Sequence, residues 1–324
     1  MTNQKKLEMA FKRYSKNFVD GIKFADVKNK YKVSGSKIEK IVEQNDTEND
    51  HILLINLNKI FSFYLSQWKH DVLISGGNHA EGLKNMHKVV FYQCVGQDLY
   101  AIKYPKMILG YSFREVVVTV VHFAMYGWEK EENILYDFMA HHFGGHLMDA
   151  NEENRHIWFL LGLYLQYRHK TIIGTNKKLH LAVKNRFKED GQRCGSIPDD
   201  LDVYDEVLER WSTGDLEEIE HLISKMSQYH SALASEIGQL GEFGDFSYGF
   251  YPFEILFLIH VRKKLGLPVP AQFDCFMMNT PEAKMVFGNP EPYPEWDPML
   301  QRIDQFYREN YPEYIPNRHG ELFQ

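Results

Sequence analysis

Apolar residues recur three and four positions apart along much of the chain, which is the spacing of one face of an α-helix. The stretch 51–64 shows this spacing, and 83–102 repeats it. Residues 154–170 are apolar nearly all round and end in cations, a pattern typical of a buried helix. The chain has no internal repeat and few hairpin-type turns. We therefore predict a mainly α protein, a helical array or bundle with few or no strands.

Several helix ends can be assigned from single residues. Ser112 is a suitable N-cap, and Glu115 follows three residues later, which is the spacing of a capping box. Gly127 ends the apolar run that follows, although the valines of this run would equally suit a buried strand. Farther along, a proline at a first helical position and Gly266 after a group of cations predict a helix over 252–265.

Charge divides the chain into segments. Residues 1–50 are rich in lysine and form a basic lead-in to an N-terminal helical domain, which we place at 1–170. A basic connector follows over 171–198, since the stretch 168–193 has eight Lys or Arg against two acids. The C-terminal helical domain, 199–324, opens with an acidic run and ends in a tail rich in proline and aromatic residues. We expect two helical domains.

Composition narrows the class of protein. The 324 residues are 44% hydrophobic and 14% aromatic, which is enough for a large buried core. A formal net charge of −7 disfavours nucleic-acid binding, which needs a basic surface. The three cysteines are far apart, without a CxxC pair, and suit a reducing compartment. Because we find neither a signal peptide nor an apolar run of the roughly 18 residues that a membrane span needs, we expect a soluble, cytoplasmic protein without membrane contact.

One short motif joins aromatic residues, a glycine and a carboxylate at the start of the last apolar helix. Its members are Tyr248, Gly249, Tyr251, Phe253 and Glu254. We expect the Glu254 carboxylate to be half-buried in the first helical turn, bound by tyrosine hydroxyls and backbone N–H groups. No second carboxylate accompanies it at a catalytic spacing, so we interpret it as a structural residue that fixes the start of the helix.

This motif resembles the "GYWxFE" element of the immunity proteins that protect bacteria from PoNe-type polymorphic nuclease toxins, with Tyr251 where a tryptophan is usual. A glycine break containing Ser75 and Gly77 is similar in place to the Ser-x-Gly break of the N-terminal domain of that family. The resemblance covers most of the chain. It implies two helical domains and a cytoplasmic protein that binds a cognate toxin, in most cases a DNase, and occludes its active site. It implies no catalytic residue and no cofactor, and it leaves the oligomeric state open.

The acidic run 199–220 has ten Asp or Glu against a single Arg. Its simplest interpretation is a solvated helix face. The alternative is a docking surface, because nucleases present basic clefts that receive phosphates, and acidic side chains can enter such a cleft. We predict that the residues which bind the toxin come from the densest part of the run: Asp199, Asp200, Asp202, Asp205 and Glu206.

A histidine-rich segment leaves a second class of function open. Asp137 and His141 are four residues apart, as are His142 and His146. On a helix this spacing puts each pair on one face, where it can bind zinc. The segment has no HExxH motif, and a glycine pair interrupts it. A metal-dependent helical hydrolase that uses His141, His142 and His146 is therefore an alternative function.

Residues 23–43 suggest a third function. They have the rhythm of a helix-turn-helix, with a short helix, a turn at Val33 and Ser34, and a second helix. The lead-in 1–50 has 11 Lys or Arg against 8 Asp or Glu, a small basic excess. A DNA-binding regulator is therefore a further alternative, although the overall charge makes a nucleic-acid partner unlikely.

Overall fold

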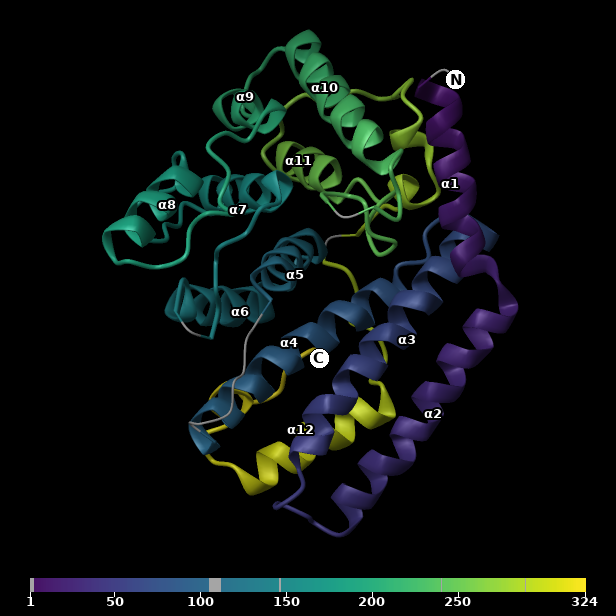
Figure 1. The fold of residues 1–324 in the computed structure, drawn as a ribbon, viewed down its shortest axis with the longest axis vertical. Helices are drawn as coiled ribbons and strands as arrows, with labels where there is room; N and C mark the ends of the chain where they lie inside the picture. The colour runs from purple at the N-terminus through teal and green to yellow at the C-terminus, as the bar shows by residue number, and fades with distance from the viewer. Residues whose placement is uncertain (1–2, 105–111, 146, 240, 289) are drawn as a thin grey trace. The chain divides into compact units, whose positions relative to one another are not determined.

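The structure is a computed structural model that describes residues 3–104, 112–145, 147–239, 241–288 and 290–324 (Figure 1). Within these ranges the chain forms twelve α-helices and three short 3₁₀ helices, and no strands assemble into a sheet. The prediction of a mainly α protein is confirmed. The helices are α1 (Asn3–Val19), α2 (Gly21–Glu43), α3 (His51–Ser75), α4 (Glu81–Lys103), α5 (Phe113–Tyr126), α6 (Glu129–His142), α7 (Arg155–Tyr167), α8 (Leu179–Glu189), α9 (Val203–Arg210), α10 (Leu216–Ala234), α11 (Phe253–Lys264), η1 (Met277–Asn279), η2 (Glu282–Lys284), α12 (Pro298–Asn310) and η3 (Ile315–Arg318).

The chain divides into two compact units, each made of two separate segments. Unit 1 comprises residues 1–16 and 150–286, and unit 2 comprises residues 17–149 and 287–324. This division differs from the domains expected from the charge pattern, whose basic connector, 171–198, lies inside unit 1. The charge pattern along the chain reflects which segments expose acidic or basic side chains to water. The units, in contrast, are defined by which segments pack against each other.

Unit 2 is closed by the segment 287–324, which packs on helices from the start of the unit. Helix α12 contacts α2 and α3. The carboxylate of Asp297, which caps α12, accepts a hydrogen bond from the hydroxyl of Tyr64 on α3 at 2.8 Å. The ring of Phe323 lies edge-on to that of Phe91 on α4, with 5.3 Å between their centroids. The proline- and aromatic-rich tail therefore contributes rings to the core of unit 2.

Helices α7 and α11 form the apolar centre of unit 1. Most side chains of both helices are buried, and the two helices contact each other. Arg262, in the last turn of α11, is also fully buried. Its guanidinium donates hydrogen bonds to the backbone oxygens of Trp211, Thr213 and Pro268, at 2.9 Å for Thr213 and 2.7 Å for Pro268. These bonds fix the loop between α9 and α10 on the end of α11.

The helix ends predicted from single residues are confirmed. The Oγ of Ser112 accepts a hydrogen bond from the N–H of Glu115 at 3.3 Å, and Gly127 ends α5 with a φ of 71°. The valine-rich segment between them is a helix and not a strand. Helix α11 differs by one residue at each end from the predicted 252–265, and Gly266 follows it with a φ of 67°.

The helix-turn-helix prediction is wrong. Helix α2 runs through the predicted turn, so Val33 and Ser34 lie in the middle of one continuous helix. Gly35 shows why the helix continues, since a β-carbon there would lie 2.5 Å from the side chain of Met299 on α12. This close packing of α12 on α2 overrides the weak helix propensity of the serine and glycine residues.

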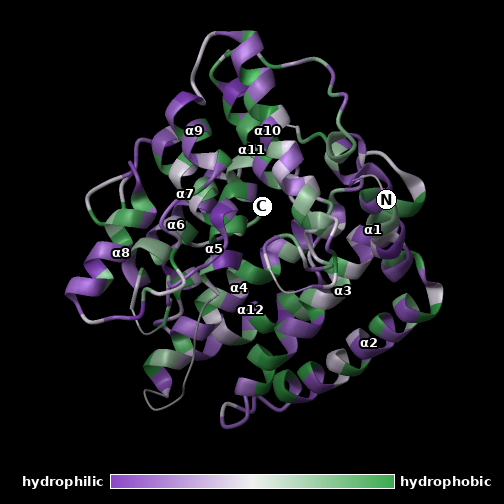
Figure 2. Cartoon of the chain, turned by 45° about the horizontal axis from the view of Figure 1, so that its top comes forward, coloured by the Kyte–Doolittle hydropathy of each residue, from purple (hydrophilic) through white to green (hydrophobic). Residues whose placement is uncertain are grey.

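None of the described helices is long and apolar enough to cross a membrane. Figure 2 shows that hydrophilic residues alternate with hydrophobic ones along the longest helices, including α2 and α4. The three cysteines, at positions 94, 194 and 275, are free thiols.

Candidate functional site

The five acids predicted to bind a partner lie around the start of α9. Asp199 and Asp200 are exposed in the loop before this helix, Asp202 is its N-cap residue, and Asp205 and Glu206 are in its first turn. The other acids of the run continue along α9, through the loop that Arg262 holds, and onto the first turns of α10. We call the surface formed by the acids of 199–220 the acidic face.

Three of the five acids form ion pairs with cations that lie outside the run. Lys184 binds the carboxylate of Asp199 at 2.6 Å, Arg155 approaches Asp200 at 3.5 Å, and Lys225 binds Glu206 at 2.7 Å. The hydrogen bond from Lys184 holds the pKa of Asp199 below its usual value, and the hydrogen bond from Lys225 does the same for Glu206. Both carboxylates are therefore charged at neutral pH.

The remaining two predicted acids differ in their roles. The carboxylate of Asp205 accepts a hydrogen bond from the backbone N–H of Leu201 at 2.8 Å, so it stabilises the turn that precedes α9. Asp202 is exposed, and its side chain forms no ion pair within the described part of the chain. Of the five predicted residues, Asp202 is therefore the one whose carboxylate is directly available to a partner.

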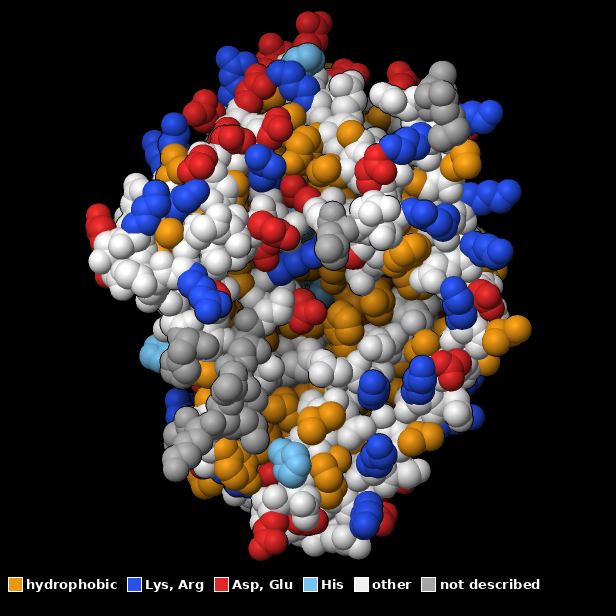
Figure 3. Space-filling view, viewed as in Figure 1, with side chains coloured by type: hydrophobic (Ala, Val, Ile, Leu, Met, Phe, Trp, Pro, Cys, Tyr) orange, Lys and Arg blue, Asp and Glu red, His pale blue; other side chains and the backbone are white. Residues whose placement is uncertain are grey.

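The acidic face keeps a net negative charge in spite of these ion pairs. Figure 3 shows red and blue side chains intermixed over α9 and α10, at the upper left of the view. Of the ten acids, four form ion pairs with cations, which are Arg155, Lys184, Arg210 and Lys225. Five acids are exposed and have no ion pair among the described residues, and one of them, Asp215, is occupied as the N-cap of α10. The side chains of the other four have no hydrogen bond either: Asp202, Glu209, Glu217 and Glu220. Sequence reasoning included only the first of these four in the predicted site.

The family-like motif lies in the core of unit 1. Glu254 is fully buried, deeper than expected, and its carboxylate faces the Nδ1 of His230 at 2.8 Å. The Nε2 of His230 faces the backbone oxygen of Gly249 at 3.1 Å. Both ring nitrogens therefore face acceptor oxygens, so a proton lies between Nδ1 and the carboxylate. A partner of Glu254 is thus a histidine on α10, a residue that the sequence did not indicate.

The glycine of the motif, Gly249, is closely surrounded by other atoms, which leave no room for a side chain. A β-carbon at Gly249 would lie 2.4 Å from Ile237 and 2.7 Å from the backbone oxygen of Asp245, so no larger residue fits there. Tyr251 and Phe253 are fully buried beside it. Tyr248 is also buried. Burial and close packing of the whole motif support the structural interpretation of Glu254, which stays a prediction.

The glycine break of unit 2 is also structural. Helix α3 ends at Ser75, Gly76 follows with a φ of 64°, and Gly77 has a φ of 81°. Residues other than glycine rarely adopt these backbone angles, so the two glycines permit the chain to leave α3 and enter α4.

The histidine-rich segment lines a cavity of about 570 Å³ in unit 2. His142 faces the carboxylate of Asp98 at 3.0 Å, and the ring of His141 is 4.7 Å from that of His142. His319 also lines the cavity. Within the described ranges, no three His, Cys, Asp or Glu side chains are grouped so that they could hold a metal ion. His146 lies outside the described residues.

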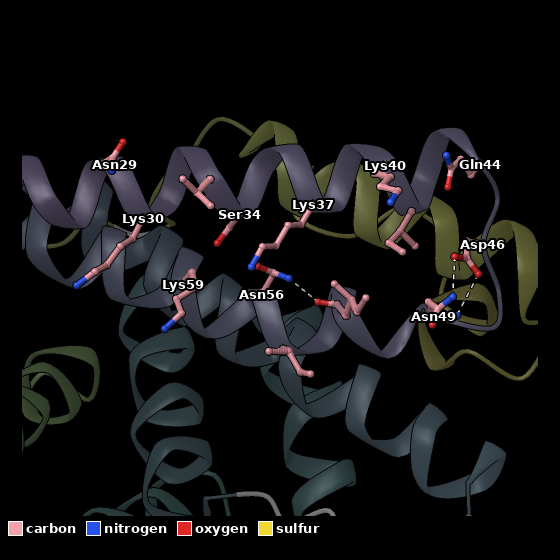
Figure 4. Close-up of a pocket in the computed structure, with 14 residues that line it drawn as sticks. Asn29, Lys30, Ser34, Lys37, Lys40, Gln44, Asp46, Asn49, Asn56 and Lys59 are labelled. Carbon is pink, nitrogen blue, oxygen red and sulfur yellow. Dashed lines mark hydrogen bonds between the residues drawn. The ribbon is translucent and has the colours of Figure 1, made fainter.

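A larger cavity, of about 830 Å³, was not foreseen from the sequence and lies between α2 and α3. Figure 4 shows it as a groove along the two helices, with Lys37 extending from α2 toward Asn56 on α3. We call it the lysine groove. Lysine and apolar residues line it together: Lys30, Val33, Lys37, Lys40, Ile41, Ile52, Ile55 and Lys59. Their spacing of three and four residues is visible in the sequence, but only if 23–43 is taken as one helix.

Comparison with known proteins adds no relative. No family model, no curated protein and no solved structure matches this chain.

Proposed function

We propose that this protein is an immunity protein, which binds and neutralises a cognate nuclease toxin in the cytoplasm without catalysis and without a cofactor. The observation that carries the proposal is the acidic face, where only four of ten acids form ion pairs with cations. The resemblance of the segment from Tyr248 to Glu254 to the motif of such immunity proteins supports the same function.

The mechanism that follows is electrostatic and steric occlusion. A nuclease binds its substrate through cations that contact phosphates, and carboxylates on a folded surface can take the place of those phosphates. The surplus of negative charge would speed the encounter and favour a basic partner over others. Because Arg262 anchors the loop between α9 and α10, the acids on both sides of this loop are held in place before binding.

The structure changes which acids should matter most. Acids that already form ion pairs must give up a partner before they can bind a toxin, whereas the exposed, unpaired acids need not. We therefore assign the main contacts to the latter. These residues are Asp202, Glu209, Glu217 and Glu220, and Asp215 is left out because its carboxylate caps α10.

The test is a rescue of toxicity. A nuclease domain encoded beside the gene is expressed in bacteria with and without this protein, and surviving cells are counted. The wild-type protein should restore growth and co-purify with the nuclease. A variant with lysine at all four unpaired positions should lose both properties, with a binding constant weakened by about tenfold or more and reduced sensitivity to salt.

The matched control reverses four exposed acids of unit 2. These are Glu48, Glu295, Glu309 and Glu321. This control has the same net charge as the test variant but leaves the acidic face unchanged. It should therefore rescue growth as well as the wild-type protein does. If wild-type protein neither rescues growth nor forms a complex, the proposed function is wrong. If rescue survives reversal of the four unpaired acids, the function stands and the acidic face is not the interface.

A further inference from the structure

The lysine groove lies wholly within unit 2 and is separate from the acidic face of unit 1. Three of its ammonium groups have no ion pair or hydrogen bond among the described residues: those of Lys37, Lys40 and Lys59. Lys30, by contrast, pairs with Asp26 on its own helix at 2.7 Å. Asp46 is the single acidic residue among the described residues of the lining, and it accepts hydrogen bonds from the backbone and side chain of Asn49. The groove is therefore strongly cationic.

The groove also exposes apolar side chains between these lysines. Val33 on α2 is 51% exposed, and Ile55 on α3 is 59% exposed. Ile52 lies one turn before Ile55 on the same face of α3, and Ile41 lies two turns after Val33 on α2. Lysines and apolar residues thus alternate along one continuous surface, and covering this surface would remove β-branched side chains from water.

We propose that the lysine groove binds an acidic, amphipathic peptide segment of a partner protein. Carboxylates of such a segment would pair with Lys37, Lys40 and Lys59, and its apolar face would cover Val33 and Ile55. The lining on α2 extends from Asn29 to Gln44, which is about 22 Å at the rise of an α-helix. This length matches a segment of about four helical turns.

The chemistry of the lining favours a peptide over a nucleic acid. Single-stranded nucleic acid is held by aromatic side chains on which bases stack, together with cations for the phosphates. No aromatic residue is among the described residues that line the groove. Aliphatic side chains between the cations are instead matched by leucine or isoleucine side chains between carboxylates. The inference does not rest on the proposed immunity function, since it concerns another unit and the opposite sign of charge.

The test measures binding of a defined probe to the full chain. The probe is a fluorescent 14-residue helical peptide with leucines at three- and four-residue spacing flanked by glutamates. Two control probes are the same peptide with lysine in place of every glutamate, and a 14-nucleotide single-stranded DNA. Binding is followed by fluorescence anisotropy at about 50 mM salt, where exposed ion pairs are weakly screened, and at about 500 mM salt, where they are strongly screened.

Variants then locate the binding site. We expect the acidic peptide to bind, and Lys37→Glu with Lys40→Glu to weaken this binding by about tenfold or more. The matched control, Lys28→Glu with Lys32→Glu, changes two exposed lysines of α2 that do not line the groove, and it should bind as the wild-type protein does. Ile55→Ser should weaken binding by about threefold or more at either salt concentration, because Ile55 is exposed and its loss removes only apolar contact.

Three results would overturn the proposal. The first is that the acidic peptide does not bind even at about 1 mM protein, a concentration at which weak binding would still be detected. The second is equal weakening by the test pair and by the control pair of lysine substitutions, which would make the attraction non-specific. The third is tighter binding of the DNA than of the peptide, with no effect of Ile55→Ser, which would identify the groove as a site for phosphates.

Discussion

Lys88 of α4 is a cation in the core of unit 2. Its side chain is fully buried, and its Nζ lies 3.3 Å from the centroid of the Trp296 ring, with no hydrogen-bond partner among the described residues. Burial lowers the pKa of the Lys88 ammonium from 10.5 to about 7, and nearby carboxylates oppose this shift only in part. The carboxylates are those of Asp304, Asp297, Glu131 and Glu81.

The size of this pKa shift sets the expected effect on stability. At 1.36 kcal/mol per pKa unit, a fall from 10.5 to about 7 corresponds to ~5 kcal/mol, which is the cost of burying the proton on Lys88. In the unfolded chain Lys88 holds its proton up to about pH 10, whereas in the folded chain it releases it near pH 7. The unfolded state thus binds more protons between these values, so stability rises with pH in this window.

Replacing Lys88 with methionine should therefore stabilise the protein at pH 7. The gain in the free energy of unfolding should be about 2–4 kcal/mol, since the lost cation–π contact with Trp296 offsets part of the relief. The advantage of Lys88→Met over the wild-type protein should stay constant below pH 7. It should shrink by about 2 kcal/mol between pH 7 and pH 9, as the wild-type lysine loses its proton in the folded state.

The assay is urea unfolding followed by circular dichroism at pH 6, 7, 8 and 9, with both proteins in the same buffers. Lys28→Met, at an exposed lysine of α2, serves as the control and should differ from the wild-type protein by a small amount that does not change with pH. The reasoning is refuted if Lys88→Met destabilises the protein at pH 7, or if its advantage is the same at pH 7 and pH 9.

Three further substitutions test the packing of unit 1 by the same unfolding assay. Gly249→Ala should destabilise the protein by about 2–4 kcal/mol, because the added methyl group would lie too close to a backbone oxygen. The control, Gly214→Ala, has open space around it and should change stability little. Equal effects of the two substitutions would contradict the packing argument. Arg262→Met should cost about 3–5 kcal/mol, since it leaves buried carbonyl oxygens without donors, and a loss below 1 kcal/mol would show that water replaces the guanidinium. Glu254→Leu should cost about 3 kcal/mol because His230 then faces no carboxylate, and a stabilised variant would refute the structural role of this contact.

Features that depend on neighbouring residues in the chain were predictable from the sequence. The Ser112 and Glu115 capping pair, the glycine at position 127 and the ends of α11 all rest on interactions within about one helical turn. Such short-range rules hold unless packing opposes them. At Gly35 packing does oppose them, because Met299 packs against this glycine and α2 continues through the expected turn. Met299 is 264 residues farther along the chain, so no short-range rule includes it.

Features that depend on distant partners were not predictable. The sequence placed Glu254 at the start of an apolar helix, but it gave no sign that His230 would be its partner. The same limit applies to the acidic face. Counting charges along 199–220 missed Arg155, Lys184 and Lys225, which neutralise part of it from other segments. The lysine groove went unrecognised for a related reason, since two separate helices contribute to it.

The closure of unit 2 by residues 287–324 has a consequence for the synthesis of the protein. The ribosome must make residues 150–286 between the two segments of this unit, which takes about ten seconds at roughly 5–20 residues per second. During that delay the faces of α2, α3 and α4 that α12 and Phe323 later cover are open to water and to other nascent chains. The folding of unit 2 must therefore wait until residues 287–324 have been made.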